Sequence, residues 1–224
     1  ADHQGTLGHR HLDRVERLEI RTNYAVLTGC NTARRQALPE ERPADASELE
    51  RMCALVREGL EQGALGLSSG VAYAPFLTTA ELTAMARVAA EYGAFYASHI
   101  RNEGERLVES IDELIEVCRG SGAAGEISHI KCYGRQNWGQ SPRALARIWE
   151  ARRAGLDISA DQYPYTGCFT GLAGTLFGQE TALRAQRRGG LRELLTDAAL
   201  RRSAEASFRQ RYAALDDGAG IILA

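Results

Sequence analysis

Apolar residues recur along the chain with the spacing of one helix face, and a short apolar run follows each such stretch. The first clear helix begins at a capping candidate, Asp45 or Ser47, and stops at Gly63. Its apolar stripe consists of Leu49, Met52, Val56 and Leu60. The apolar run Ala64–Leu67 follows directly and predicts a strand. Helix and strand therefore alternate in this part of the chain.

The same alternation recurs further along. Thr78 and Glu81 are spaced as a capping box, and Gly93 ends the helix that they begin. Ser141 and Pro142 open a later helix in cap and first-turn positions. The strands predicted in this way are Tyr24–Thr28, Ala64–Leu67, Phe95–Ser98, Glu126–His129 and Leu156–Asp161.

Strands that alternate with helices of this length form a parallel sheet covered by helices, so the predicted fold class is α/β. Repeats of nearly constant length, without a GxGxxG turn after the first strand, favour a (β/α)8 TIM-type barrel over a doubly wound dinucleotide fold. A complete barrel needs about 250 residues. We therefore expect residues 1–224 to be the interior part of one barrel domain, supplying about five central strand-helix units. The flanking strands and any small β-domain would lie outside this chain.

Composition narrows the class of partner. The net charge is −2, from 27 basic and 29 acidic residues, which favours neither nucleic acid nor an anionic membrane. The composition is compatible with a small-molecule partner, and the oligomeric state stays open. No apolar run approaches the roughly 20 residues of a membrane span. The five cysteines include no CxxC pair, which predicts neither a disulfide framework nor a zinc ribbon and fits the cytoplasm.

Polar residues stand where predicted strands end, and in a parallel barrel these ends meet at one mouth. His99 and His129 occupy equivalent positions of adjacent repeats, 30 residues apart. Neutral imidazoles on neighbouring strands are well placed to bind one Zn²⁺ at about 2.0 to 2.1 Å each. We therefore predict that these two histidines are metal ligands.

Other candidates for chemistry are weaker. His9 and His11 form an HxH pair, but they stand in a charged, helix-like context without an apolar strand around them. Cys30 follows a strand and could be a thiolate ligand, although a cysteine there is more often a small buried hydrophobe. Ser68 and Ser69 are interpreted as a tight turn, since no GxSxG elbow indicates a serine nucleophile.

Four motifs resemble those of the N-acyl-D-amino-acid deacylase (D-aminoacylase) family of zinc amidohydrolases. They agree with that family in order and spacing, and the resemblance covers roughly residues 20 to 224. The four segments are Gly63–Gly70 (GALGLSSG), Ser98–Gly104 (SHIRNEG), Ile127–Lys131 (ISHIK) and Asp161–Tyr165 (DQYPY).

The resemblance implies a zinc ion held by two histidines from consecutive strands, here His99 and His129, and by a cysteine from an earlier strand. The metal polarises the amide carbonyl and lowers the pKa of its water toward ~7. The implied reaction is hydrolysis of the amide bond of N-acyl-D-amino acids, which releases a carboxylic acid and a D-amino acid. The segments that carry the ligand cysteine and the catalytic aspartate are absent, so no catalytic residue is named. Asp161 is expected to support the site rather than act as the base.

Lys131 is predicted to bind the substrate carboxylate, with Tyr163 and Tyr73 assisting. It lies two residues beyond His129, and alternate side chains of a strand point the same way. An ammonium suits a carboxylate without competing for the metal. The opposite interpretation is a lysine exposed to solvent.

Two other functions stay open at this point. One is a related cyclic-amide amidohydrolase of the dihydropyrimidinase or hydantoinase type, which shares the barrel and the histidines at the strand ends. The other is a non-catalytic barrel remnant, which would lack the cysteine and the aspartate.

Overall fold

The computed structural model describes residues 12, 15–168, 170–178, 181–182, 185, 189–190, 192 and 196–214. The chain divides into two compact units, Ala1–Lys131 with Gln140–Gln162, and Cys132–Gly139 with Tyr163–Ala224. His9, His11 and the apolar run at 220–224 lie outside the described residues. The prediction that residues 1–224 belong to one barrel domain stays a prediction.

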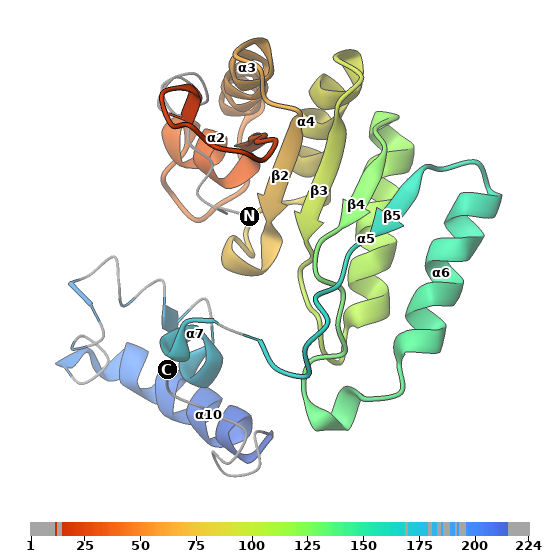
Figure 1. Ribbon diagram of the computed structural model, residues 1–224. Coiled ribbons are helices and arrows are strands. Elements are labelled where there is room, and N and C mark those ends of the chain that lie inside the picture. The colour runs from red at the N-terminus through yellow and green to blue at the C-terminus, as the bar shows by residue number, and fades with distance from the viewer. Residues whose placement is uncertain are drawn as a thin grey trace. The chain divides into compact units, whose positions relative to one another are not determined.

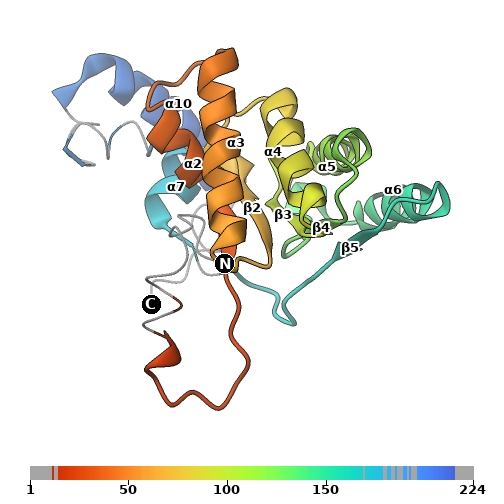
Figure 2. The same ribbon diagram turned by 90° about the horizontal axis from the view of Figure 1, so that it is seen from above.

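The first unit is built on one parallel sheet whose strands follow the order of the chain (Figure 1). Helices α3 to α6 lie in a row on one face of this sheet, as the view from above shows (Figure 2). This confirms the predicted α/β class. The five strands are β1 (Leu27–Gly29), β2 (Gly66–Gly70), β3 (Phe95–His99), β4 (Gly125–Ile127) and β5 (Ile158–Ala160).

Helices α3 and α4 begin where the sequence predicted, whereas α6 has Gln140 at its N-cap instead of the predicted Ser141. Asp45 caps α3 and Thr78 caps α4, each in a complete capping box with the glutamate three residues later. Two short 3₁₀ turns, η1 (Val71–Tyr73) and η2 (Arg135–Asn137), lie in loops. The helices of the first unit are α2 (Cys30–Ala37), α3 (Ala46–Glu61), α4 (Thr79–Glu91), α5 (Leu107–Ser121) and α6 (Ser141–Arg153).

The strands differ from the predicted ones at their ends. β1 and β2 begin later than expected, and β4 stops at Ile127. The interpretation of Ser68 and Ser69 as a tight turn is wrong, because both are buried in β2 and pair with β3. The Ser69 hydroxyl lies 2.7 Å from the Tyr96 hydroxyl and 2.9 Å from the Ser98 hydroxyl. Partners on the next strand therefore satisfy a polar side chain that the local sequence associates with a turn.

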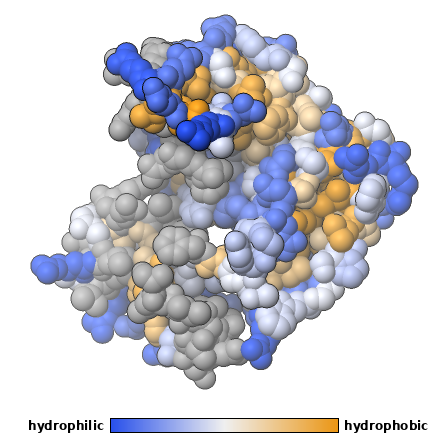
Figure 3. Space-filling model, in the orientation of Figure 1, coloured by the Kyte–Doolittle hydropathy of each residue, from blue (hydrophilic) through white to orange (hydrophobic). Residues whose placement is uncertain are grey.

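The core of the first unit lies between the sheet and its helices, and it uses the predicted apolar stripes. Several of its side chains have no exposed surface: Met52, Val56, Leu67, Met85, Ile111, Ile127 and Ile158. Helix α6 differs, because Leu145 is 48% exposed and Trp149 is 57% exposed. Figure 3 shows apolar surface on the side of this unit that carries α6.

The second unit contains α7 (Leu172–Phe177) and α10 (Ala198–Ala214). Phe177 packs against a small buried cluster of Ala185, Leu200 and Ala204. The rings of Phe177 and Phe208 stack with centroids 6.0 Å apart. No helix in the described part of the chain combines the length and the apolar character that crossing a bilayer requires.

Gly66→Ala is expected to destabilise the first unit. A Cβ at this position of β2 would lie 2.8 Å from the backbone oxygen of Phe95 and 3.1 Å from Leu27 Cδ2. The Phe95 oxygen belongs to the neighbouring strand and cannot turn aside, so the strands must separate slightly. Overpacking of this kind costs about 1 to 3 kcal/mol, which thermal unfolding would show as a lower Tm.

Gly171→Ala is the matched control, because its φ of −69° suits any residue and a Cβ there has no neighbour within 4 Å among the described residues. We expect it to stay within about 0.5 kcal/mol of the parent protein. Equal Tm values for the two variants would contradict the close approach of β2 and β3 at Gly66.

Candidate metal centre

The ends of β3 and β4 bring the two predicted ligands together. His99 is the last residue of β3, and His129 comes two residues after the end of β4. His99 Nδ1 lies 2.8 Å from His129 Nε2, and the two rings meet edge to face at 75° with centroids 4.4 Å apart. The structure therefore points one nitrogen of each ring at the other.

A turn held by Asp161 sets the direction of His129. The backbone at His129 has a φ of +44°, a left-handed conformation that is uncommon outside glycine. The Asp161 carboxylate accepts a hydrogen bond from the His129 backbone N–H. The Asp161 backbone also accepts from Ile130 (3.0 Å) and donates to Ile127 (3.1 Å). Asp161 thus fastens the turn, which agrees with a supporting part at the site.

Glu103 joins the two histidines from the loop after β3. Its Oε1 lies 2.9 Å from His129 Nδ1, and its Oε2 lies 3.9 Å from His99 Nε2. Oε1 also accepts a hydrogen bond from the ammonium of Lys131. Of the residues that the structure describes, His99, Glu103 and His129 form a group whose ligating atoms all lie within 4.8 Å of one another.

Sequence reasoning missed Glu103, although it quoted the segment that contains it. The available signal was a carboxylate four residues after His99 in Ser98–Gly104. Burial raises the pKa of this carboxyl, but the hydrogen bond with His129, the charge of His99 and the contacts with Lys131 together outweigh burial. The pKa of Glu103 therefore lies below its ordinary value, and the group is held as a carboxylate.

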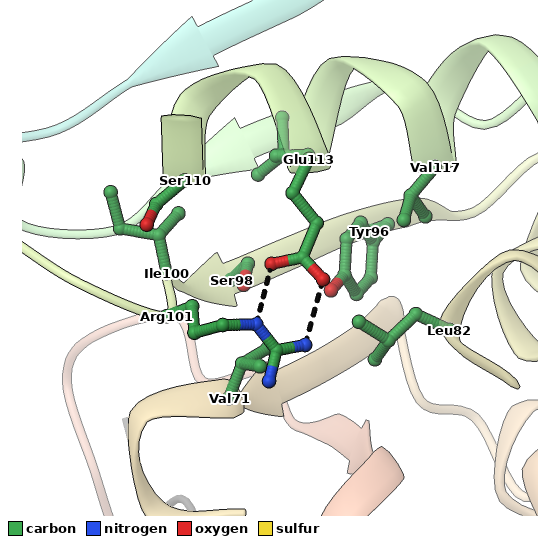
Figure 4. Close-up of a pocket in the computed structure, with 10 residues that line it drawn as sticks. Val71, Leu82, Tyr96, Ser98, Ile100, Arg101, Ser110, Glu113 and Val117 are labelled. Carbon is green, nitrogen blue, oxygen red and sulfur yellow. Dashed lines mark hydrogen bonds and ion pairs between the residues drawn. The ribbon is translucent and has the colours of Figure 1, made fainter. Parts of the chain in front are cut away.

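Arg101 fastens the loop after β3 to the loop after β2 and to α5, and Figure 4 shows its ion pair with Glu113. Its guanidinium pairs with both oxygens of Glu113 on α5, at 2.8 and 2.7 Å. It also donates to the backbone oxygens of Pro75 (2.8 Å) and Leu77 (2.7 Å) in the loop after β2. One side chain thus ties together α5, the loop that carries Glu103 and the loop that follows Tyr73. The Tyr73 ring lies against His99, with centroids 4.8 Å apart.

Lys131 points at the histidines rather than into solvent. Its side chain is 15% exposed, and Nζ lies 2.9 Å from His129 Nδ1. The direction was predicted from the alternation of side chains along a strand. That reason is wrong, because β4 ends at Ile127 and the alternation does not extend to Lys131. Tyr163 belongs to the second unit, and its part in binding stays a prediction.

A cavity of about 410 Å³ lies against the sheet beside His99. Glu126 lines it, and one oxygen of this carboxyl is buried without a hydrogen-bond partner among the described residues. Burial raises the pKa of Glu126 above its ordinary value. Other polar side chains on the wall are Ser68, Ser69, Ser128 and Asp161.

The donor set fits a zinc ion. Two tetrahedral ligands at about 2.05 Å from a zinc ion would stand about 3.3 Å apart. The facing nitrogens of His99 and His129 are 2.8 Å apart, so a small rotation of one ring accommodates the metal. Cys30 does not suit a ligand role, because it is completely buried and burial raises the pKa of its thiol. It is a core residue, as the alternative interpretation had it.

Comparison with known proteins identifies relatives of this chain. No protein-family model matches the chain. Over 152 residues, the chain is 43% identical to an N-acyl-D-glutamate deacylase of Alcaligenes xylosoxydans xylosoxydans, covering 66% of this chain and 31% of the relative. The crystal structure of N-acyl-D-glutamate deacylase from Bordetella bronchiseptica superposes with a TM-score of 0.65 at 36% identity, covering 68% of this chain and 33% of that one. The chain belongs to the D-aminoacylase family of amidohydrolases.

The chain is also similar to a solved structure of D-aminoacylase, with a TM-score of 0.64 at 31% identity over 75% of this chain and 40% of that one. The relatives of the D-aminoacylase family are amidohydrolase barrels, so the five parallel strands are an arc of the predicted TIM-type barrel. The chain spans about a third of the length of the curated relatives that it matches.

Proposed function

We propose that this chain carries part of the active site of a zinc-dependent hydrolase that cleaves the amide bond of N-acyl-D-amino acids. The products are a carboxylic acid and a free D-amino acid. The observation that carries the proposal is the pair of facing nitrogens, His99 Nδ1 and His129 Nε2, at the end of a sheet of the D-aminoacylase family. The Bordetella bronchiseptica relative is described in complex with zinc and a phosphonate that mimics the tetrahedral intermediate. That complex supports both the metal and the reaction.

His99 and His129 would hold the zinc ion, which supplies a Lewis acid for the amide carbonyl and activates water for the hydrolysis. The backbone turn held by Asp161 and the loops tied by Arg101 keep these side chains in place. A cysteine ligand and an aspartate as general base are expected on segments outside this chain. One solved D-aminoacylase is described by a binuclear centre with one-metal activation and second-metal attenuation. We assign the activating metal to the two histidines.

Lys131 would hold the substrate carboxylate. An ammonium has three protons to donate, so Lys131 can keep its bond to Glu103 and still bind a second carboxylate. The site is partly buried, which strengthens a charge-assisted contact relative to the same contact in water. Tyr73, whose ring packs on His99, would line the substrate pocket, and a part for Tyr163 in binding the substrate stays a prediction.

The assay that tests the proposal compares N-acetyl-D and N-acetyl-L amino acids for release of free amine. We expect hydrolysis of the D-series and little of the L-series. With the carbonyl at the metal and the carboxylate on Lys131, the side chain of the wrong enantiomer points to the other side of Cα. The His99→Ala protein, prepared in parallel, measures any contaminating acylase. Equal rates on both series would contradict the proposal, and activity confined to hydantoins or dihydropyrimidines would assign the protein to the cyclic-amide hydrolases.

We also propose that further strand-helix units of the barrel pack against this arc. In the described residues β1 and β5 are the edges of the sheet, whereas a closed barrel has none. The exposed Leu145 and Trp149 of α6 supply apolar surface for a neighbouring helix. Those units, and any small β-domain, would belong to parts of the protein outside residues 1–224.

A further inference from the structure

Glu103 lies against the ring nitrogens that do not face the proposed metal position. The facing pair is His99 Nδ1 and His129 Nε2, at 2.8 Å. Glu103 instead approaches the other nitrogen of each ring, with Oε1 2.9 Å from His129 Nδ1 and Oε2 3.9 Å from His99 Nε2. One carboxylate therefore spans the outer sides of both imidazoles.

We infer that Glu103 is a positioning residue that fixes the proton of His129 on Nδ1 and so keeps the lone pair of Nε2 on the side of the proposed metal position. A neutral imidazole has one N–H and one lone pair, and the hydrogen bond at one nitrogen decides which is which. Metal-binding histidines commonly donate their second N–H to a carboxylate, which sets both the tautomer and the direction of the ring. The inference rests on the proposed zinc-dependent function.

The position of Lys131 argues against Glu103 as a direct ligand. The ammonium of Lys131 hydrogen-bonds Glu103 and lies 2.9 Å from His129 Nδ1. A metal ion bound between Glu103 and the outer nitrogens would stand beside this ammonium, and two cations at such a distance repel. The 2.9 Å contact places the Lys131 ammonium beside the outer nitrogen of His129, which is not the nitrogen that faces His99.

The ammonium of Lys131 also explains why a carboxylate is needed beside His129 Nδ1. Left alone with His129, the ammonium would donate to Nδ1, which would place the ring proton on Nε2 and remove the lone pair from the metal side. Glu103 Oε1 accepts a hydrogen bond from the ammonium of Lys131 and can accept another from the Nδ1–H of His129, so both donors point at one acceptor. The same contact holds Lys131 at the edge of the site, where the substrate carboxylate is proposed to bind.

Hydrogen bonds of the neighbouring Asn102 hold the loop that carries Glu103, as a positioning role requires. Asn102 Oδ1 accepts hydrogen bonds from the backbone N–H groups of Gly104 (2.9 Å) and Arg106 (3.0 Å). The Asn102 backbone N–H donates to Ser110 Oγ at 3.0 Å. The Glu103 side chain is 14% exposed, so water replaces its contacts only with difficulty.

The test compares Glu103→Gln and Glu103→Ala with the parent protein, using zinc affinity from competition with a chelator. Loss of an outer-shell partner lowers metal affinity about 10- to 100-fold. We expect that loss in Glu103→Ala, a smaller one in Glu103→Gln, whose amide oxygen can still accept the Nδ1 proton, and one zinc per chain at saturation in both. Glu105→Gln, an exposed neighbour in the same loop, should bind zinc as the parent does.

Two spectroscopic readouts separate positioning from ligation. In the zinc-loaded parent protein, ¹⁵N NMR of the histidine rings should show His129 protonated at Nδ1, with the Nδ1–H resonance shifted in Glu103→Gln. X-ray absorption at the zinc edge should show the same number of ligands in all three proteins. A lost oxygen ligand in Glu103→Ala, or unchanged zinc affinity in both variants, would overturn the inference. If the parent protein itself bound no zinc, the proposed function would fail instead.

Discussion

His99→Ala and His129→Ala are each expected to abolish tight zinc binding. Each substitution removes one of the two nitrogens that face each other at 2.8 Å, so the facing pair is lost. The loss should exceed the roughly 100-fold that removal of an outer-shell partner reaches, because a direct ligand is removed. The measurement is zinc content per chain after dialysis against a chelator, and the parent protein should retain about one zinc ion.

Two controls accompany this measurement. His9→Ala should retain zinc, because His9 stands in a charged, helix-like sequence context without an apolar strand around it. Circular dichroism and the Tm of each variant show that the fold is intact, which is expected because neither ring belongs to the apolar core. Full zinc occupancy in both the His99→Ala and the His129→Ala protein would remove the metal centre from these residues.

Lys131→Met is expected to keep zinc but to lose kcat/KM on N-acyl-D-amino acids. A charge-assisted contact contributes ~1.5 to 3 kcal/mol, so its loss lowers kcat/KM roughly tenfold to more than a hundredfold. Methionine retains much of the length of the side chain without the ammonium. The corresponding substrate amides carry no carboxylate, so activity on them should fall much less.

Steady-state kinetics on a matched acid and amide pair, with zinc content measured on the same samples, distinguish the outcomes. A fall in zinc content would show that Lys131 acts through His129, whose Nδ1 lies 2.9 Å from Nζ. Parent-like kcat/KM on the best N-acyl-D-amino acid would mean that Lys131 does not bind the substrate carboxylate.

The predictions made from the sequence succeeded where the interactions are local. The cap at Asp45 and the capping box at Thr78 each involve residues within four positions, and the apolar stripe of α3 repeats every three or four. Constant spacing of the repeats was enough to order the strands as a parallel sheet and to place His99 and His129 near the ends of neighbouring strands. These features need no knowledge of which distant segments meet.

The strand ends depended on partners far along the chain. Ser69 belongs to β2 because Tyr96 and Ser98 on β3 bond its hydroxyl, across 27 and 29 residues. His129 turns away from β4 with a φ of +44° because Asp161, 32 residues later, accepts its backbone N–H. The local sequence pattern contains neither contact. It therefore predicted a turn at Ser69 and a strand that continued to His129.

The sequence by itself determined that two histidines stand at equivalent strand ends, because a period of 30 residues places them there. Only the tertiary structure decided which nitrogens face each other and that Glu103 lies behind both rings. The direction of Lys131 was decided in the same way, by its contacts with Glu103 and His129 beyond the end of β4. Side-chain direction after a strand ends is set by three-dimensional partners, since the alternation of a strand stops with its backbone pairing.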